Sequence, residues 1–225
     1  MMRLFCSLFY RDYKLAIRHV QTYVPLATFV LSALFLHWIG GYHEAGLTLY
    51  VPGILLFFIF LALFSALDTL YVDDFKSGFL THYYFLNQCL TTFVTIRFIN
   101  QWLLICLPLV LLSPLLAISL GVQQNVYWLI PVNALATVIF SAILTLHSLL
   151  TIGNTQGRAL LSLLTLPLLI PPFILIALFY TTLTSTLPTY HLLYALLGGC
   201  LIAVPLCLML GSWGLKTALM EHIAA

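Results

Sequence analysis

The sequence predicts an all-helical integral membrane protein that crosses the bilayer six times. Of the 225 residues, 63% are hydrophobic and only 6% are charged, whereas about a quarter of the residues in a soluble domain are charged. Apolar stretches of about 20 residues, enough to cross a hydrocarbon core of about 30 Å, recur along the whole chain. They lack the alternation of apolar and polar residues that marks the strands of a membrane barrel.

Residues 2–20 predict a helix that lies on the membrane surface. Arg3, Arg11, Lys14 and Arg18 recur at steps that place them on one helical face. Such a basic stripe suits the anionic cytoplasmic leaflet of a membrane. A cleaved signal peptide is the competing interpretation, but its basic region is brief and here the basic residues continue to Arg18. We therefore expect a retained interfacial helix that forms an elbow before the first span.

A single transmembrane domain, residues 1–225, is expected to hold the six spans. Their predicted bounds are about 22–40, 50–71, 98–120, 126–152, 159–181 and 192–215. The eight Lys and Arg residues all fall on the side shared by the two termini and the connections 72–97 and 153–158. The excess of positive charge on cytoplasmic segments predicts that both termini lie in the cytoplasm, which also requires an even number of spans.

The largest cytoplasmic connection, segment 72–97, predicts a short amphipathic helix. Asp73 and Asp74 are suited to its start, where free N–H groups and the helix dipole favour carboxylates. One expected face carries Phe75, Phe79, Tyr83, Leu86 and Leu90, and the other carries Ser77, Thr81, Tyr84 and Gln88. Two roles remain open for this helix. It rests on lipid, or it docks a cytoplasmic partner.

Prolines interrupt two of the predicted spans. The third span contains Pro108 and Pro114, and the fifth contains Pro167, Pro171 and Pro172. Proline removes a backbone donor and bends a helix, which a membrane protein tolerates when neighbouring groups satisfy the freed carbonyls. Static kinks and hinges of a transporter that changes access are equally compatible with this pattern.

Polar groups inside the spans are sparse, which excludes several classes of function. No acidic residue lies in the middle of a span, so a proton carrier based on membrane carboxylates is disfavoured. His37, His43 and His191 lie toward the outer side and could ligate haem iron, although interfacial histidines bonded to water or backbone are the favoured alternative. The five cysteines show no metal-binding spacing, so no metal site is expected.

No catalytic residue and no nucleic-acid partner are expected either. The phosphate-loop motif of ATPases is absent, as are the Gly-x-Ser-x-Gly and His-Glu-x-x-His motifs of hydrolases. The formal net charge of +2 is too small to indicate binding of nucleic acid. The chain itself is therefore not expected to be an enzyme.

Several stretches resemble one known family. The run Leu67-Asp68-x-Leu70-Tyr71-x-Asp73-Asp74-x-x-Ser77-Gly78-x-Leu80 resembles the loop after the second span in the membrane subunit of the cytochrome c maturation ABC transporter, the haem exporter protein B family. Later stretches that share the resemblance are Leu107-Pro108-Leu109, Leu112-Ser113-Pro114-Leu115, Gly121, Leu160-Leu161-Ser162 and Leu166-Pro167-Leu168-x-x-Pro171. The resemblance covers essentially the full length of the chain.

The resemblance implies a permease-like bundle of the ABC-2 type with a cytoplasmic coupling helix. A separate ABC ATPase would bind the ATP and dock on Asp68, Asp73, Asp74, Phe75, Ser77, Gly78, Phe79, Leu80 and Tyr83. The family further implies a second copy of the chain, a haem-handling membrane subunit and a bacterial or organellar inner membrane. Haem would be the cargo, or ATP would drive release of a haem-loaded chaperone. A permease for another substrate and a membrane scaffold without transport remain alternatives.

Overall fold

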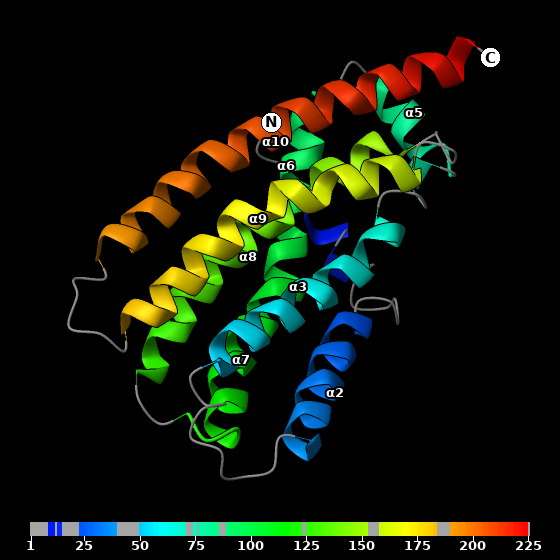
Figure 1. The fold of residues 1–225 in the computed structure, drawn as a ribbon. Coiled ribbons are helices and arrows are strands. Elements are labelled where there is room, and N and C mark those ends of the chain that lie inside the picture. The colour runs from blue at the N-terminus through cyan, green and yellow to red at the C-terminus, as the bar shows by residue number, and fades with distance from the viewer. Residues whose placement is uncertain are drawn as a thin grey trace.

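The computed structural model is a bundle of long helices (Figure 1). It describes residues 9–11, 13–14, 23–39, 50–70, 74–75, 77–85, 89–122, 125–152, 158–183 and 190–224. Within these ranges every regular element is helical and no strand occurs, which confirms the all-helical class for the described part. The elements are α2 (Val24–Ile39), α3 (Val51–Leu70), α5 (Phe79–Phe85), α6 (Leu90–Gln101), η2 (Trp102–Cys106), α7 (Leu107–Ser119), η3 (Val126–Trp128), α8 (Leu129–Leu150), α9 (Arg158–Leu183) and α10 (Tyr190–Ala224).

Among the residues that the structure describes, three helical runs are long and apolar enough to cross a membrane. They are Leu90–Ser119, Val126–Leu150 and Tyr190–Met220. Three shorter apolar helices accompany them, Val24–Trp38, Val51–Ser65 and Pro167–Thr182. The helix that contains the third predicted span begins at Leu90, earlier in the chain than residue 98, and the bounds of the span itself stay a prediction. Residues 90–97 contain no glycine or proline that would end a helix, and apolar side chains recur among them, so the helix extends back toward the coupling segment.

Helix α8 lies at the centre of the bundle. It contacts α10, α9, α3 and α7, and Figure 1 shows it behind α9 with α10 alongside. Close approach to α10 depends on small residues, because a Cβ atom added to Gly211 or Gly214 would lie 2.6 Å from the side chain of Leu149 or Leu150. Small residues at such positions are the usual means of tight helix packing in membranes.

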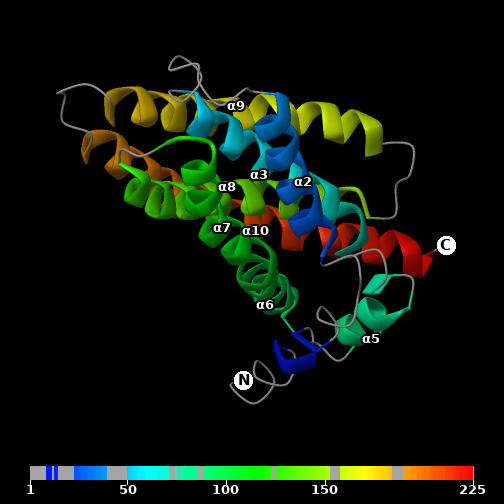
Figure 2. The same cartoon turned by 90° about the horizontal axis from the view of Figure 1, so that it is seen from below.

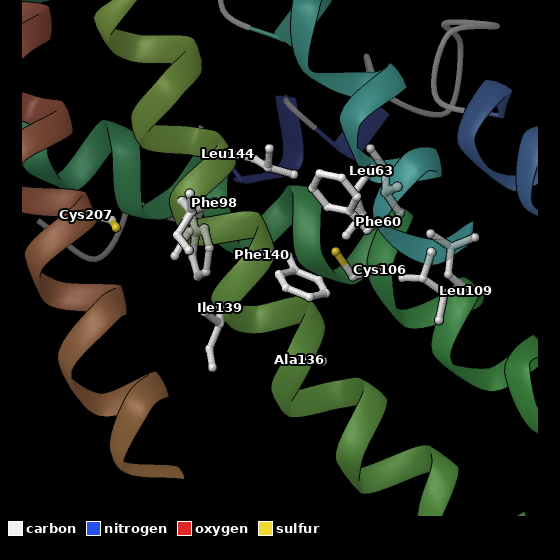
Figure 3. Close-up of a cluster of buried hydrophobic side chains, with 14 of the residues drawn as sticks. Phe60, Leu63, Phe98, Cys106, Leu109, Ala136, Ile139, Phe140, Leu144 and Cys207 are labelled. Atoms are coloured by element: carbon white, nitrogen blue, oxygen red, sulfur yellow. The ribbon is translucent and has the colours of Figure 1, made fainter. Parts of the chain in front are cut away.

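Aromatic rings fill the core between α3, α8 and α9. The ring centroid of Phe140 lies 5.7 Å from that of Phe60 and 4.8 Å from that of Phe173. Figure 3 shows Phe140 of α8 pointing toward Phe60 of α3, with Cys106 close by. Phe140 and Cys106 are fully buried. The core therefore joins the N-terminal and C-terminal halves of the chain into one bundle.

The prolines take different places in their helices. Pro108 is the second residue of α7, which begins directly after the π-helical turn η2, and Pro114 lies inside α7. Pro167, Pro171 and Pro172 lie inside α9, where Pro172 is buried and the other two are exposed. All five are thus accommodated within helical segments.

Of the predicted interfacial helix 2–20, only residues 9–11 and 13–14 are described, and these are helical. Tyr10 and Tyr13 are exposed there. Figure 2 shows this segment beside the beginning of α6 and close to α5, at the end of the bundle where α10 terminates. The two parts of the chain that the sequence places on the cytoplasmic side therefore meet in space.

Candidate functional site

The candidate site is the coupling segment, residues 74–75 and 77–85. Asp74 and Phe75 are helical, and the chain then turns at Ser77 and Gly78 before α5 begins. The Gly78 N–H donates to the Phe75 carbonyl at 3.2 Å, and the Gly78 carbonyl accepts the first bond of α5 from the His82 N–H at 3.0 Å. Gly78 has φ 73°, a left-handed conformation that glycine adopts without steric cost.

Two arginines from distant parts of the chain bind the Asp74 carboxylate. The Arg11 Nη2 atom lies 3.5 Å from Oδ1, and the Arg97 Nη2 atom lies 3.2 Å from Oδ2. The Arg11 guanidinium also lies over the Phe79 ring, 3.8 Å from its centroid, in the geometry of a cation–π contact. Asp74, Arg11 and Arg97, here named the charge cluster, thus connect the N-terminal segment, the coupling segment and α6.

A further contact fixes the N-terminal segment to α6. The Asn100 side-chain amide donates to the Phe9 carbonyl at 3.3 Å, and Asn100 is 3% exposed. Because a buried amide requires a hydrogen-bond partner, this contact determines where the N-terminal segment lies relative to α6.

Aromatic packing holds α5 against α6. Leu80 is fully buried and Tyr83 nearly so. The Phe93 ring of α6 lies 6.1 Å from that of Phe79 and 5.6 Å from that of Tyr83. Burial raises the pKa of the Tyr83 phenol, and the nearby Cys89 contributes in the same direction. The inward face of α5 is therefore part of the bundle's core.

The outward face of α5 differs from the expected one. Ser77, Gly78, His82 and Phe85 are exposed, whereas Thr81 and Tyr84 are half-buried. The expected faces were counted as one helix from Phe75 onward, but the turn at Gly78 starts a new helix with a different phase. Sequence reasoning missed His82 and Phe85. They lie four and seven residues after Gly78, the spacing of one helical face, so the pattern was available once the turn was recognised.

The other residues singled out from sequence are distributed more widely. Asp68 lies in α3 and Phe75 packs partly buried against the core, while Asp73 and His43 lie outside the described residues. His37 lies near the end of α2 and His191 near the start of α10. Within the described ranges, no group of three His, Cys, Asp or Glu side chains is placed to hold a metal ion.

Comparison with known proteins identifies the family. The model of the CcmB protein family matches residues 3–219. Heme exporter protein B of Haemophilus influenzae is 32% identical over 173 residues, which cover 76% of this chain and 78% of the relative. Heme exporter protein B of Rhodobacter capsulatus is 33% identical over 170 residues (75% and 78%), and that of Pseudomonas aeruginosa is 33% identical over 181 residues (78% and 79%). The chain belongs to the CcmB protein family.

Proposed function

We propose that this chain is the membrane subunit of an ATP-driven transporter complex that serves c-type cytochrome biogenesis. The observation that carries the proposal is the family match over residues 3–219, together with the curated relatives that bear the name Heme exporter protein B. The apolar helices suit a multi-pass protein of the bacterial or organellar inner membrane. The distribution of Lys and Arg favours cytoplasmic termini.

Six membrane crossings are part of this proposal. Besides the three long apolar runs, α3 has 20 residues and α9 has 26, which correspond to about 30 Å and about 39 Å of helix. A hydrocarbon core is about 30 Å thick. Helix α2, with 16 residues, reaches about 24 Å, and it needs the flanking residues to complete a crossing.

The partner is an ABC ATPase that docks on the outward face of the coupling segment. This chain has no phosphate-loop motif, so ATP binds to the partner. Ser77, His82 and Phe85 form the exposed surface, and the Phe85 side chain is 68% exposed. An exposed aromatic side chain is a typical anchor of a protein interface. Leu80 and Tyr83 support this surface from inside.

The rest of the complex follows from the family. A second copy of the chain and a haem-handling membrane subunit join the ATPase, and haem is the cargo of the complex. Two cycles remain candidates. Either haem passes the membrane, or the ATP-driven motion releases a haem-loaded chaperone on the periplasmic side. His37, His43 and His191 are the weak candidates for haem ligands, and no cofactor is assigned to this chain itself.

Copurification tests the partner surface. Truncating an interface anchor typically costs about 2 kcal/mol or more, which corresponds to about 30-fold weaker binding. We expect Phe85→Ser to reduce by this factor the ATPase that copurifies in mild detergent. Tyr127→Ser is the matched control, because Tyr127 is 67% exposed and lies near the opposite end of the α6–α7 helix. Equal retention of the ATPase by both variants would exclude α5 as the docking surface.

Deletion of the gene tests the pathway. We expect loss of c-type cytochromes, measured by haem staining of membrane fractions, and recovery when the intact chain is restored. Normal maturation after deletion would instead support a permease for another substrate. Failure of any ATPase to copurify with the intact chain would support a scaffold without transport.

A further inference from the structure

Helix α8 carries a row of buried polar side chains. Asn133, Thr137, Ser141 and Thr145 recur every four residues, and each is 0% exposed. A buried polar group in an apolar bundle is costly unless it is hydrogen-bonded. The partners of these four side chains therefore indicate what the row does.

Two of the four side chains form hydrogen bonds to the helical run α6–η2–α7, and a third lies beside a thiol of that run. The Asn133 amide donates to Ser113 Oγ at 3.0 Å. The Thr145 hydroxyl lies 3.4 Å from Gln101 Oε1, and the Ser141 hydroxyl lies beside the Cys106 thiol. Both hydroxyls also donate within α8, Thr145 to the Ser141 carbonyl at 2.7 Å and Ser141 to the Val138 carbonyl at 3.1 Å.

The outermost pair also reaches a third helix, because the Tyr180 hydroxyl of α9 donates to Asn133 Oδ1 at 3.0 Å. Thr137 differs from its three neighbours in the row because, within the described part of the chain, it forms no hydrogen bond to another helix. Its hydroxyl donates to the Ala134 carbonyl of its own helix at 2.9 Å. The three cross-helix pairs are named the polar ladder: Asn133–Ser113, Ser141–Cys106 and Thr145–Gln101.

The π-helical turn η2 keeps the polar ladder in register. Gln101 and Cys106 are five residues apart, and in a regular α-helix a five-residue step leaves two side chains about 140° apart around the axis. In η2 the Leu107 N–H bonds to the Trp102 carbonyl, five residues back, so the turn holds one extra residue. This wider turn brings Gln101 and Cys106 to the same side, facing α8.

The same helical run is joined to the charge cluster at its inner end. Arg97 binds Asp74 at 3.2 Å, and Asn100 binds the Phe9 carbonyl. We propose that α6, η2, α7 and α8 form one rigid transmission unit, which the polar ladder holds in register and which carries displacement of the coupling segment to the outer half of the bundle. That the unit carries motion outward from the coupling segment rests on the proposed function, whereas the rigidity of the unit does not.

The proposal assigns static roles to two prolines. Pro108 follows η2 and lies between the rungs at Cys106 and Ser113, and Pro114 is adjacent to Ser113. Pro108 therefore lies inside a segment that is fastened to α8 on either side, and Pro114 directly follows the outermost rung. A hinge at these positions would have to break a rung. The prolines of α9 lie outside the unit.

Electron spin resonance distances test the rigidity in the full-length protein in lipid nanodiscs. Labels are attached through noncanonical amino acids at Thr92 of α6 and Ile130 of α8, so that Cys106 stays in place. We expect a narrow distance distribution in the wild type, its loss in Ser113→Ala and Asn133→Leu, and its return in Ser113→Asn combined with Asn133→Ser. Thr137→Val is the matched control, because Thr137 makes no rung, and it should stay narrow. Equal broadening by Thr137→Val and Ser113→Ala would overturn the proposal.

Two single-residue deletions test the role of η2. Removing Leu103 leaves Gln101 and Cys106 four residues apart, the spacing of one α-helical face, so the narrow distribution should persist. Removing Leu111, an equally apolar and exposed residue of regular α7, turns part of α7 by about 100°, so the narrow distribution should be lost. Equal damage by both deletions would refute the register argument.

A second label pair separates this proposal from the proposed function. In the complex with the ATPase and a non-hydrolysable ATP analogue, the distance from Thr92 to Ile130 should not change, while that from Thr92 to Leu34 of α2 should shift. A change within the first pair overturns the rigid unit. If neither distance responds, coupling to the ATPase fails, and the variants without nucleotide still decide whether the unit is rigid.

Discussion

Removing the charge of Asp74 should loosen the coupling segment. Each ion pair, at 3.2 and 3.5 Å, has a Coulomb attraction of about 5 kcal/mol at an effective dielectric constant of about 20. Desolvation offsets most of this attraction. Exposed pairs contribute at most about 1 kcal/mol, while the Asp74 and Arg97 side chains are each only 14% exposed. We therefore expect Asp74→Asn to cost about 2 kcal/mol of local stability.

Hydrogen exchange measures this local cost directly. A loss of about 2 kcal/mol makes opening about 30-fold more frequent, so the amides of His82 and Tyr83 should exchange about 30-fold faster in Asp74→Asn. The amides of α8 should not change. Lys216→Gln, which removes an exposed charge away from the cluster, controls for the loss of a charged side chain as such.

A double-mutant cycle tests whether the loss comes from the ion pair itself. Because Asp74 and Arg97 share one pair, Asp74→Asn combined with Arg97→Gln should cost clearly less than the sum of the two single changes. Unchanged exchange in Asp74→Asn, or strict additivity, would refute the charge cluster as the element that holds α5.

Two further predictions concern the ends of the coupling segment. Gly78→Ala places a Cβ in open space at φ 73°, so its only cost is backbone strain of about 1–2 kcal/mol. The amides of α5 should therefore exchange about 5- to 30-fold faster, and the increase should be smaller for Gly78→Asn. Equal increases in the two variants would contradict the argument from strain. Hydrogen bonds from the Thr92 backbone N–H and hydroxyl hold the pKa of the exposed Cys89 below its usual value, so maleimide should react with its thiolate at lower pH than with a free thiol. Thr92→Val should raise that pKa and move the pH profile of alkylation upward, and identical profiles would contradict this assignment.

Composition and local pattern were enough to predict the helical membrane class, whereas the coupling role of segment 72–97 stays a prediction. Long apolar runs have few structural solutions in a bilayer, so their helical state follows from the sequence. The glycine at position 78 also indicates a turn, and a turn there starts a new helix whose faces cannot be counted from Phe75. As a result Thr81 and Tyr84 were assigned to the outward face in place of His82 and Phe85.

Contacts between distant residues were beyond the reach of local pattern. Arg11 and Arg97 were read as markers of membrane orientation, and nothing in their spacing indicates that both bind Asp74. The polar ladder was missed for a similar reason. The five-residue step from Gln101 to Cys106 has no meaning until α8 is known to lie opposite, because only the partner helix defines which side must carry polar groups.

The charge cluster also determines when the coupling segment can take its final place during protein synthesis. Asp74 leaves the ribosome well after Arg11 and before Arg97, so it has only one of its two arginine partners until the helix that begins at Leu90 has been made. The polar ladder requires Thr145, which is translated later still. Because chains fold as they emerge from the N-terminus, a complete charge cluster requires that the chain up to Arg97 has already been made and packed.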